Sequence, residues 1–576
     1  MIKTAEALIL FLSLLFFVPS SAFSQEEEDF QRLARRSIDN YEAEVKKQQP
    51  DYDSVAWHGA AYIGTSSRGH ILPNGFFNYK RGKLQMAGNV EMDFSQINTS
   101  RSVEGIHGNG DHQLTDTKIA NRYEHEDLTF RIDYHLDKQN VLSFDFFQKY
   151  YADRVGETAT RHNRAKDGSE NNKFEDQQRK EWKINCGSLV EYLHQFGFGG
   201  SFSARAYIKY DNTPTDINSV VWGKEMVYEE KDDHKAHHST DTKGQLLFHS
   251  PKWGGFSFSL REKIGFMSTR ISDAISLFDY HVTQVLTSGA LNYNVGRFSF
   301  VAEGGYESYH HKLETLSDNT KGDVMNTYRD FLYNLSATWK INARNKFTAS
   351  YKHSINRPTY TQLYPFVHVG SNIGSRVKGN EDLQPSVTNQ VQGKYTFSVQ
   401  SLTLSTSVTY QKKSDDITGI ATYDEEEQVN VKTWINDAEY NTVRGALEGE
   451  MRAGKFGMTF GARVQRLWYD GETVSEDKAW SYSFKIRPQL KLPNEWMLSA
   501  VSLYNGRESH LHWYSNPFTY LAFRAQKQLG DWAVYGFVQD ILNEDRVKSE
   551  NSNNNVLVTS NDYNARALII GCSYRF

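Results

Sequence analysis

The residues best suited to bind a metal ion are histidines that lie close together in polar stretches. The segment DDHKAHH contains His234, His237 and His238 within five positions. Imidazole is the commonest metal ligand near neutral pH, so metal or haem capture by these three residues is one hypothesis. The alternative, which the polar surroundings favour, is a solvated surface loop. The sequence predicts no bound cofactor.

No group of residues forms a recognisable catalytic motif. The sequence lacks G-x-x-x-x-G-K-[ST], H-E-x-x-H and G-x-S-x-G, which mark phosphate-binding, zinc-protease and serine-hydrolase sites. No catalytic residues are therefore predicted, and an enzyme is the least favoured class of function. The 65 Lys and Arg residues nearly balance the 70 Asp and Glu residues, so no basic field favours nucleic acid. The 2 cysteines exclude a disulfide framework.

Most of the chain alternates apolar and polar residues. Within residues 201–210 the apolar positions share one parity, and Ser203, Arg205, Tyr207 and Lys209 share the other. Side chains alternate across a β-strand, so this pattern predicts one apolar and one polar face. The same alternation recurs in residues 131–136, 346–352 and 456–465.

The alternating segments are joined by short turns and long polar stretches in strict succession. The expected loops are residues 96–118, 152–179, 213–239, 357–388, 418–435 and 544–563. Short turns on one side and long loops on the other are typical of outer-membrane barrels. We therefore predict an all-β fold, a transmembrane antiparallel β-barrel of about 20–22 strands with long extracellular loops and short periplasmic turns.

Closure of the sheet follows from the membrane, where an open edge would leave backbone groups without partners. A mean hydropathy of -0.64 leaves no room for a bundle of transmembrane helices. A soluble β-propeller or sandwich would also alternate and is the alternative fold. The abundance of Phe and Tyr near strand ends favours the aromatic girdles of a bilayer protein.

The two ends of the chain predict its destination. Residues 1–24 have the charged, apolar and small-residue order of a signal peptide, and residues 25–56 are expected to form a short periplasmic segment, either a helix or a mobile leader. The barrel is expected over residues 57–576, integral to the outer membrane. Its last strand ends in Tyr574 and Phe576 and resembles the signal that barrel-insertion machinery recognises.

One long loop carries a motif that identifies a family. An Arg-Pro pair, an aromatic residue, Leu-x-Pro-Phe and Gly-Asn-x-x-Leu-x-Pro follow one another before a strand, and the pattern resembles the barrel of TonB-dependent outer-membrane receptors, in particular the outer membrane protein beta-barrel family. The motif residues are Arg357, Pro358, Pro365, Phe366, Gly379, Asn380, Leu383 and Pro385. Since proline cannot donate to a strand ladder, these residues are expected to shape a loop outside the sheet and not to mark a ligand site.

The resemblance implies uptake of nutrients or other solutes across the outer membrane, or capture of ligands at the surface. Receptors of this family fill the lumen with an N-terminal plug, for which residues 25–56 are too few. The lumen is therefore expected to be open, occluded by its own loops, or closed by another protein. The alternative function is a non-conducting scaffold whose loops bind a surface lipoprotein or partner receptor. Lumenal charges of both signs predict no strong ion selectivity.

Overall fold

The computed structural model describes the chain from residue 55 to residue 576 with short gaps. The described residues are 55–67, 69–106, 110–223, 227–272, 277–315, 324–363, 368–369, 375–424, 429–436, 439–469, 480–509, 513–544, 546–552, 555–562 and 566–576. The predicted signal peptide, and the predicted periplasmic segment up to residue 54, lie outside these residues. The first described strand begins at Val55.

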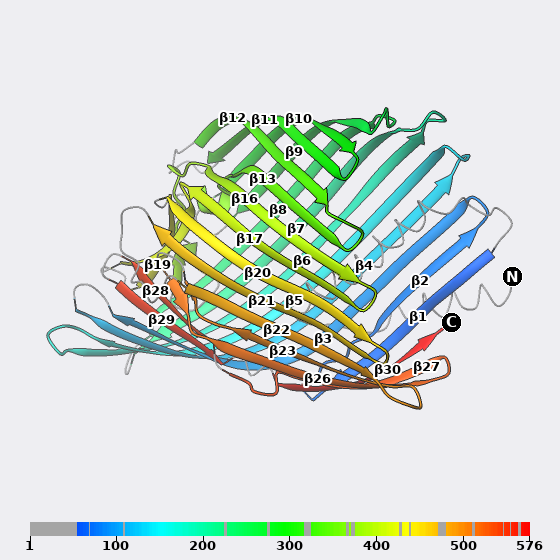
Figure 1. The fold of residues 1–576 in the computed structure, drawn as a ribbon. Coiled ribbons are helices and arrows are strands. Elements are labelled where there is room, and N and C mark those ends of the chain that lie inside the picture. The colour runs from blue at the N-terminus through cyan, green and yellow to red at the C-terminus, as the bar shows by residue number, and fades with distance from the viewer. Residues whose placement is uncertain are drawn as a thin grey trace.

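The chain forms a closed antiparallel barrel of 22 strands (Figure 1). The first half contains β1 (Val55–Ser66), β2 (Asn74–Arg81), β3 (Leu84–Ile106), β4 (His112–His135), β5 (Asn140–Arg164), β6 (Glu170–Gln195), β7 (Ser201–Trp222), β8 (Val227–His249), β9 (Phe256–Ser272), β10 (Leu277–Val295) and β11 (Phe298–Thr315). The second half contains β12 (Val324–Lys340), β13 (Asn345–Asn356), β16 (Ser386–Val399), β17 (Leu402–Ser414), β20 (Tyr440–Ala453), β21 (Phe456–Tyr469), β22 (Trp480–Lys491), β23 (Trp496–Asn505), β26 (Phe518–Leu529), β27 (Trp532–Gln539) and β30 (Ala567–Arg575).

The barrel closes where the last strand meets the first. β30 pairs with β27 on one side and with β1 on the other, and β1 also pairs with β2. At the end of this seam the backbone N–H of Gly59 donates to the Phe576 carbonyl over 2.9 Å. The predicted range of 20–22 strands is therefore confirmed at its upper limit.

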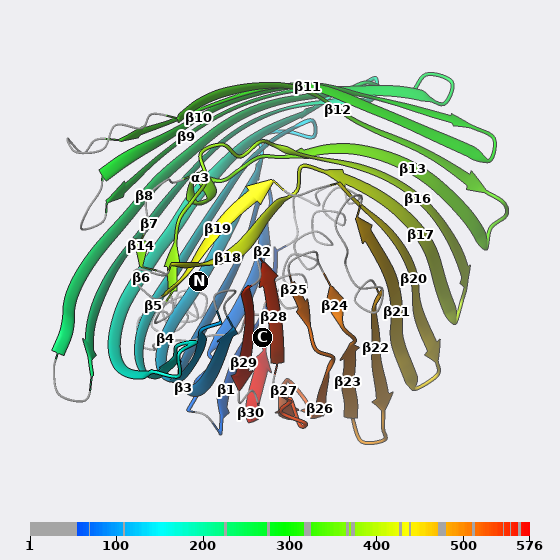
Figure 2. The same cartoon turned by 90° about the vertical axis from the view of Figure 1, so that its left-hand side faces the viewer.

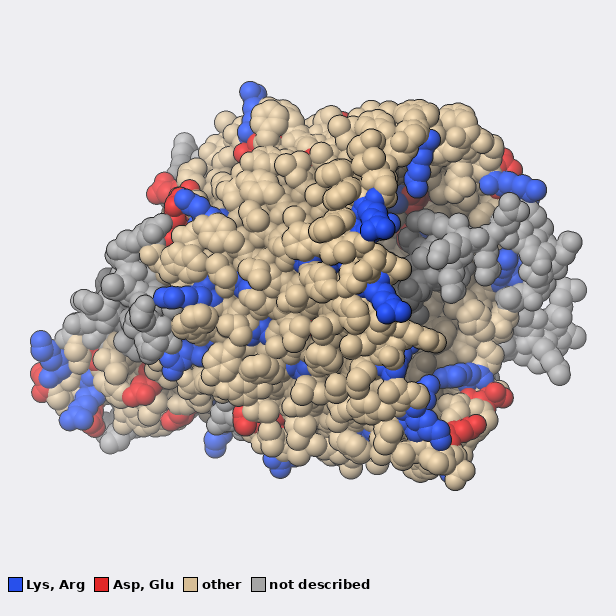
Figure 3. Space-filling model, viewed as in Figure 1, with Lys and Arg blue, Asp and Glu red and all other residues tan. Residues whose placement is uncertain are grey.

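The alternation predicted from the sequence is confirmed. Ile208, Val464 and Phe347 are exposed on the outer face, and the polar residues between them face the lumen. Figure 3 shows a side of the barrel where uncharged residues dominate and acidic side chains gather toward the two ends. An outer face of this kind suits lipid, and the polar inner face suits a wet lumen. Within the described residues no helix is long and apolar enough to cross a membrane.

Three of the six predicted loops are wrong in position. Residues 96–118, 152–179 and 213–239 are mainly the extracellular ends of β3 to β8, which have 22 to 26 residues each. A strand needs only about ten residues to cross a bilayer, so these strands extend far beyond it. In these ends the buried positions hold polar side chains such as Thr117, Glu157 and Gln177 as well as apolar ones. The alternation of apolar and polar residues that identifies a strand in the sequence therefore disappears.

The remaining three predicted loops form long extracellular connections that contain secondary structure. Residues 357–388 include α3 (Tyr360–Leu363), β14 (His368–Val369) and β15 (Ser375–Val377). Residues 418–435 lie in the hairpin β18 (Ile417–Asp424) and β19 (Val429–Asn436), which joins β14 and β15 in a four-stranded sheet. Residues 544–563 include the hairpin β28 (Arg546–Ser552) and β29 (Asn555–Asp562).

The height of the barrel wall varies around the ring, and β9 to β12, with 17 to 19 residues, are intermediate. We call β3 to β8 the tall wall. We call β13, β16, β17, β20, β21 and β22 the low wall, because its strands have only 12 to 14 residues. Strands β2, β27 and β30 are shorter still, with 8 or 9 residues, and β1 has 12. Above them, β29 pairs with the upper part of β3, and β28 pairs with β25 (Trp513–Ser515), which itself pairs with β24 (Glu508–Ser509).

Candidate functional site

The most specific structure in the lumen is formed by the loop between β13 and β16. We call its described residues, 357–363, 368–369 and 375–385, the cap. Figure 2, which looks along the barrel, shows α3, β14, β18 and β19 inside the ring of barrel strands. The cap therefore turns inward from the end of β13 and occupies the extracellular part of the lumen.

The cap is fixed at its first residue by two ion pairs. Arg357 Nη1 pairs with Glu307 Oε2 of β11, and Nη2 lies 2.5 Å from Asp330 Oδ2 of β12. The guanidinium also lies 4.6 Å from the ring centre of Tyr309, within cation–π range. The Glu307 side chain is 5% exposed, so removal of Arg357 would leave a buried carboxylate without its cation.

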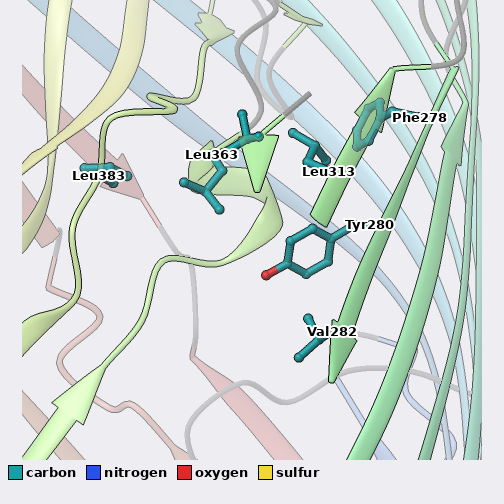
Figure 4. Packing of buried hydrophobic residues seen from close by; sticks show 7 residues of the cluster. Phe278, Tyr280, Val282, Leu313, Leu363 and Leu383 are labelled. Carbon is teal, nitrogen blue, oxygen red and sulfur yellow. The ribbon is translucent and has the colours of Figure 1, made fainter. Parts of the chain in front are cut away.

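Apolar residues fix the rest of the cap. Leu363 of α3 and Leu383 are both fully buried and belong to one apolar cluster with Phe278, Tyr280 and Leu313 of β10 and β11. Leu363 is the member of the cap that faces these wall residues, and Leu383 lies on the far side of Leu363 (Figure 4). Burial of a leucine side chain contributes about 1.5–3 kcal/mol, so these two side chains stabilise the docked cap. The predicted polar lumen therefore contains an apolar patch, which the chain itself covers.

A hydrogen-bonded turn connects the cap to the neighbouring loop. The backbone N–H of Asn380 donates to the Gln362 carbonyl over 2.6 Å, and its Nδ2 donates to the Trp434 carbonyl in β19 over 3.0 Å. Asn436 Nδ2 donates to the carbonyl of Gln384 over 2.8 Å. The cap and the β18–β19 hairpin are thereby linked on both sides of Leu383.

A buried histidine lies beneath the cap. His311 is fully buried, its ring nitrogens have no hydrogen-bond partner among the described residues, and the rings of Tyr280, Tyr309 and Tyr328 surround it at 5.6–6.0 Å. His311 lies on the extracellular side of the large apolar residues that β11 exposes on its outer face, the last of which is Tyr306. Burial lowers the pKa of the His311 imidazole to about 4, and His310 and Arg357 act in the same direction. The neutral imidazole is therefore the form that fits beneath the docked cap.

The three candidate metal ligands do not converge. They lie in β8 and not in a loop, and neighbouring positions of a strand point to opposite faces. His234 is exposed and its Nδ1 lies 2.5 Å from Asp216 Oδ1, and His238 is exposed as well. His237 is partly buried and stacks on Tyr360 of the cap at 5.4 Å. Among the described residues no three His, Cys, Asp or Glu side chains gather to hold a metal ion.

The family motif takes a more internal position than the sequence predicts. Pro358 and Gly379 are buried, and Pro385 is partly buried directly before β16. Pro365 and Phe366 lie outside the described residues. The inward course of the cap was missed, although apolar Leu363 and Leu383 in a polar stretch were a signal for it. At the other candidate signal, Tyr574 packs on Trp532 at 4.8 Å, and Phe576 lies 6.1 Å from Trp57.

Comparison with known proteins agrees with this architecture. The family model of the "Outer membrane protein beta-barrel family" matches residues 287–574, half of the chain, and includes the cap and the strands that carry it. The chain belongs to this family. Its barrel is an integral protein of the outer membrane. A search of curated proteins finds no match.

Solved structures of outer-membrane transporters and receptors have the same fold as this family member. The "Copper transporter OprC" matches with a TM-score of 0.65 and 10% identity over 92% of this chain and 84% of that one. The FrpB iron transporter from Neisseria meningitidis matches with a TM-score of 0.61 and 10% identity over 90% and 81%. The hemophore receptor HasR of Serratia marcescens matches with a TM-score of 0.58 and 11% identity over 90% and 80%. At such identities the likeness concerns the fold alone.

Proposed function

We propose that this barrel takes part in the uptake of solutes or nutrients across the outer membrane, and that its cap controls entry to the lumen. The single observation that carries this proposal is the docking of the cap inside the barrel through Arg357, Leu363 and Leu383. A loop without a role in the lumen would not need the ion-paired Arg357 and two fully buried leucines. No bond is made or broken in this function.

Passage of a solute through the lumen then requires the cap to move away from its docked position. The ion pairs of Arg357 with Glu307 and Asp330 lie at the point where the cap leaves β13, so they must break before the cap can move away from the wall. A ligand that contacts the cap or the β18–β19 hairpin from outside can shift this equilibrium only if it binds the displaced form more tightly. The proposed mechanism is therefore ligand-assisted opening of a loop-occluded barrel.

Planar-bilayer conductance of the purified protein tests this proposal. The wild type is expected to pass small or intermittent currents, and the Arg357→Ala protein, whose cap is loosened, to pass larger and longer ones. Arg344→Ala is the matched control, because Arg344 is an exposed residue in the turn between β12 and β13, at the opposite end of the latter strand from the cap. Equal conductance in the wild type and the Arg357→Ala protein would contradict control by the cap.

The second candidate function is a scaffold that binds a surface lipoprotein or a partner receptor. The observation that favours it is the tall wall, whose strands extend far beyond the length that a bilayer requires. Co-purification from native membranes tests it. A stable partner that is lost when the upper hairpin of β5 and β6 is shortened, together with silence of both proteins in the bilayer, would favour the scaffold over uptake.

A further inference from the structure

The inner face of the low wall carries many more cations than carboxylates. Alternation places Lys352 of β13, Lys394 of β16, Arg444 of β20 and Arg463 of β21 toward the lumen, between outward residues such as Tyr395 and Val464. β22 adds Lys485 and Arg487 to the same face. The acidic residues of this face are Glu448 and Glu450, both on β20, and Glu450 already pairs with Arg452 over 2.6 Å.

Four of these cations form no ion pair with any described carboxylate. Lys352, Lys394 and Arg463 have no charged partner within the described residues, and Arg444 donates from Nε to the neutral Gln465 Oε1 over 2.9 Å. Arg463 and Lys352 are also exposed, so their charges face the lumenal water. The charges of these four side chains are therefore available to a bound ligand.

Strand register places Lys394, Arg444 and Arg463 in the same region of the inner face. Lys394 is paired with Ser407, Ser407 with Ala446, and Ala446 with Arg463, so one row of the sheet begins and ends in a cation. Arg444 lies two positions from Ala446 on β20, on the same face. Neighbouring strands are about 4.8 Å apart, so the row spans roughly 14 Å.

The inner face of the tall wall shows the opposite arrangement. Arg131 pairs with Asp133 and Asp145 over 3.0 and 3.4 Å, Lys149 with Asp127 over 2.6 Å, and Arg205 with Glu191 over 2.7 Å. Because carboxylates of the tall wall neutralise its cations, this wall fits the prediction of lumenal charges of both signs. The low wall is the exception.

The residues between the low-wall cations are neutral hydrogen-bonding groups. Gln392 donates to Thr409 over 3.0 Å, and Ser405, Ser407 and Gln465 belong to the same face. Like charges on neighbouring positions of a sheet destabilise it, and an anion that bridges them removes this repulsion. Amide and hydroxyl groups beside the cations can bind the oxygen atoms of carboxylates, phosphates or sulfonates.

We propose that the low wall is a binding track for a solute with two or more anionic groups. The proposal rests on the proposed uptake function, since the solute reaches the track through the lumen. Lys394, Arg444 and Arg463 bind its oxyanions, and the tall wall, which is already neutralised, contributes no net attraction. The solute class of this barrel is therefore polyanionic.

Binding of a fluorescent pyrene trisulfonate to the purified full-length protein in zwitterionic detergent, followed by fluorescence anisotropy, tests the track. The wild type is expected to bind this probe with an affinity that falls as salt is raised. The triple substitution Lys394→Gln, Arg444→Gln and Arg463→Gln is expected to weaken binding at least tenfold, and Arg444→Lys with Arg463→Lys to preserve most of it.

The matched control is the triple substitution Lys138→Gln, Lys252→Gln and Arg344→Gln, at exposed positions in short turns between strands. It changes the net charge by the same amount and is expected to alter the dissociation constant less than threefold. An unfolded variant is recognised by the loss of the fast-migrating band of a folded barrel in unheated gels. No probe binding by the wild type, or an equal loss in both triple variants, would overturn the proposal.

Current measurements separate this proposal from the proposed function. In the Arg357→Ala background, a potassium chloride gradient is expected to give a reversal potential near that of chloride, which moves toward zero in the low-wall triple variant. Probe binding without any current would contradict uptake and leave the anion track standing. Current with no preference for chloride and no probe binding would contradict the track and leave uptake standing.

Discussion

The tall wall and the low wall belong to one barrel but satisfy their polar groups in different ways. Cations of the tall wall, such as Arg131 and Arg205, pair with carboxylates of their own or the neighbouring strand. Cations of the low wall, such as Lys394 and Arg463, face the lumen without such partners. Between the two walls, the cap covers an apolar patch on the inner face of β9 to β12.

The difference separates groups that maintain the structure from groups that are available to a ligand. A buried charge that loses its partner destabilises the fold, so the paired charges of the tall wall and the Arg357 ion pairs are structural. An exposed cation facing water needs no partner for stability. The expected effects on stability are therefore largest for the groups that hold the cap and smallest for an exposed cation of the low wall.

Arg357→Ala is expected to destabilise the docked cap by about 3–5 kcal/mol, because it leaves the buried carboxylate of Glu307 unpaired. Reaction of a thiol reagent with Leu383→Cys, in a background with Cys186→Ser and Cys572→Ser, measures the exposure of the cap. The reaction is expected to be fast with Arg357→Ala and slow without it. Equal rates would show that the ion pairs do not hold the cap.

Acidification is expected to release the cap through His311. Because its pKa is about 4 in the docked cap and ordinarily 6.5, the displaced form binds more protons between these values. The stability of the docked cap is therefore full above pH 6.5 and falls as the pH drops toward 4, by about 3 kcal/mol.

The rate of thiol labelling at Leu383→Cys measures this pH dependence after correction for reagent reactivity. Protein with His311→Phe is the control, because phenylalanine fills the space without binding a proton. A pH dependence that is unchanged in the His311→Phe protein would assign the effect to another group.

Arg131→Gln is expected to lower the free energy of unfolding by about 2 kcal/mol, since Asp133 would remain buried with its charge unpaired. Urea unfolding in lipid vesicles measures the change. Asp133→Asn combined with Arg131→Gln should recover most of the loss. A single Arg131→Gln variant as stable as the wild type would mean that the tall wall does not depend on its ion pairs.

Arg463→Gln is expected to change the free energy of unfolding by less than about 0.5 kcal/mol, or to raise it slightly by removing repulsion from Arg444. The same urea unfolding experiment measures it. A loss similar to that of Arg131→Gln would show that the two walls do not differ, and the contrast between structural and available charges would fail.

The cap shows where sequence analysis reached its limit. The Arg-Pro and Gly-Asn motif was sufficient to identify the family, and Leu363 and Leu383 were visible as apolar residues in a polar stretch. The other members of their cluster, Phe278, Tyr280 and Leu313, come from strands far away in the sequence. An apolar residue in a loop does not specify which distant surface it will cover.

The strand ends show a second limit. The membrane part of the tall wall was predicted because lipid on one side and water on the other impose alternation on every strand. The upper parts of β3 to β8 were assigned to loops because both of their faces carry polar side chains, including buried ones such as Thr117 and Glu157. There the strands are maintained by backbone hydrogen bonds to their neighbours, which leave no periodic signal in the side chains.

The sequence by itself determined that this protein is an outer-membrane barrel, because the period of a strand and the two solvents on its faces act locally on each residue. The tertiary structure alone decided the height of each wall, the docking of the cap in the lumen and the partners of each charge. These features depend on contacts between residues that are distant in the chain, and strand register, which sets those contacts, is established only when the barrel closes.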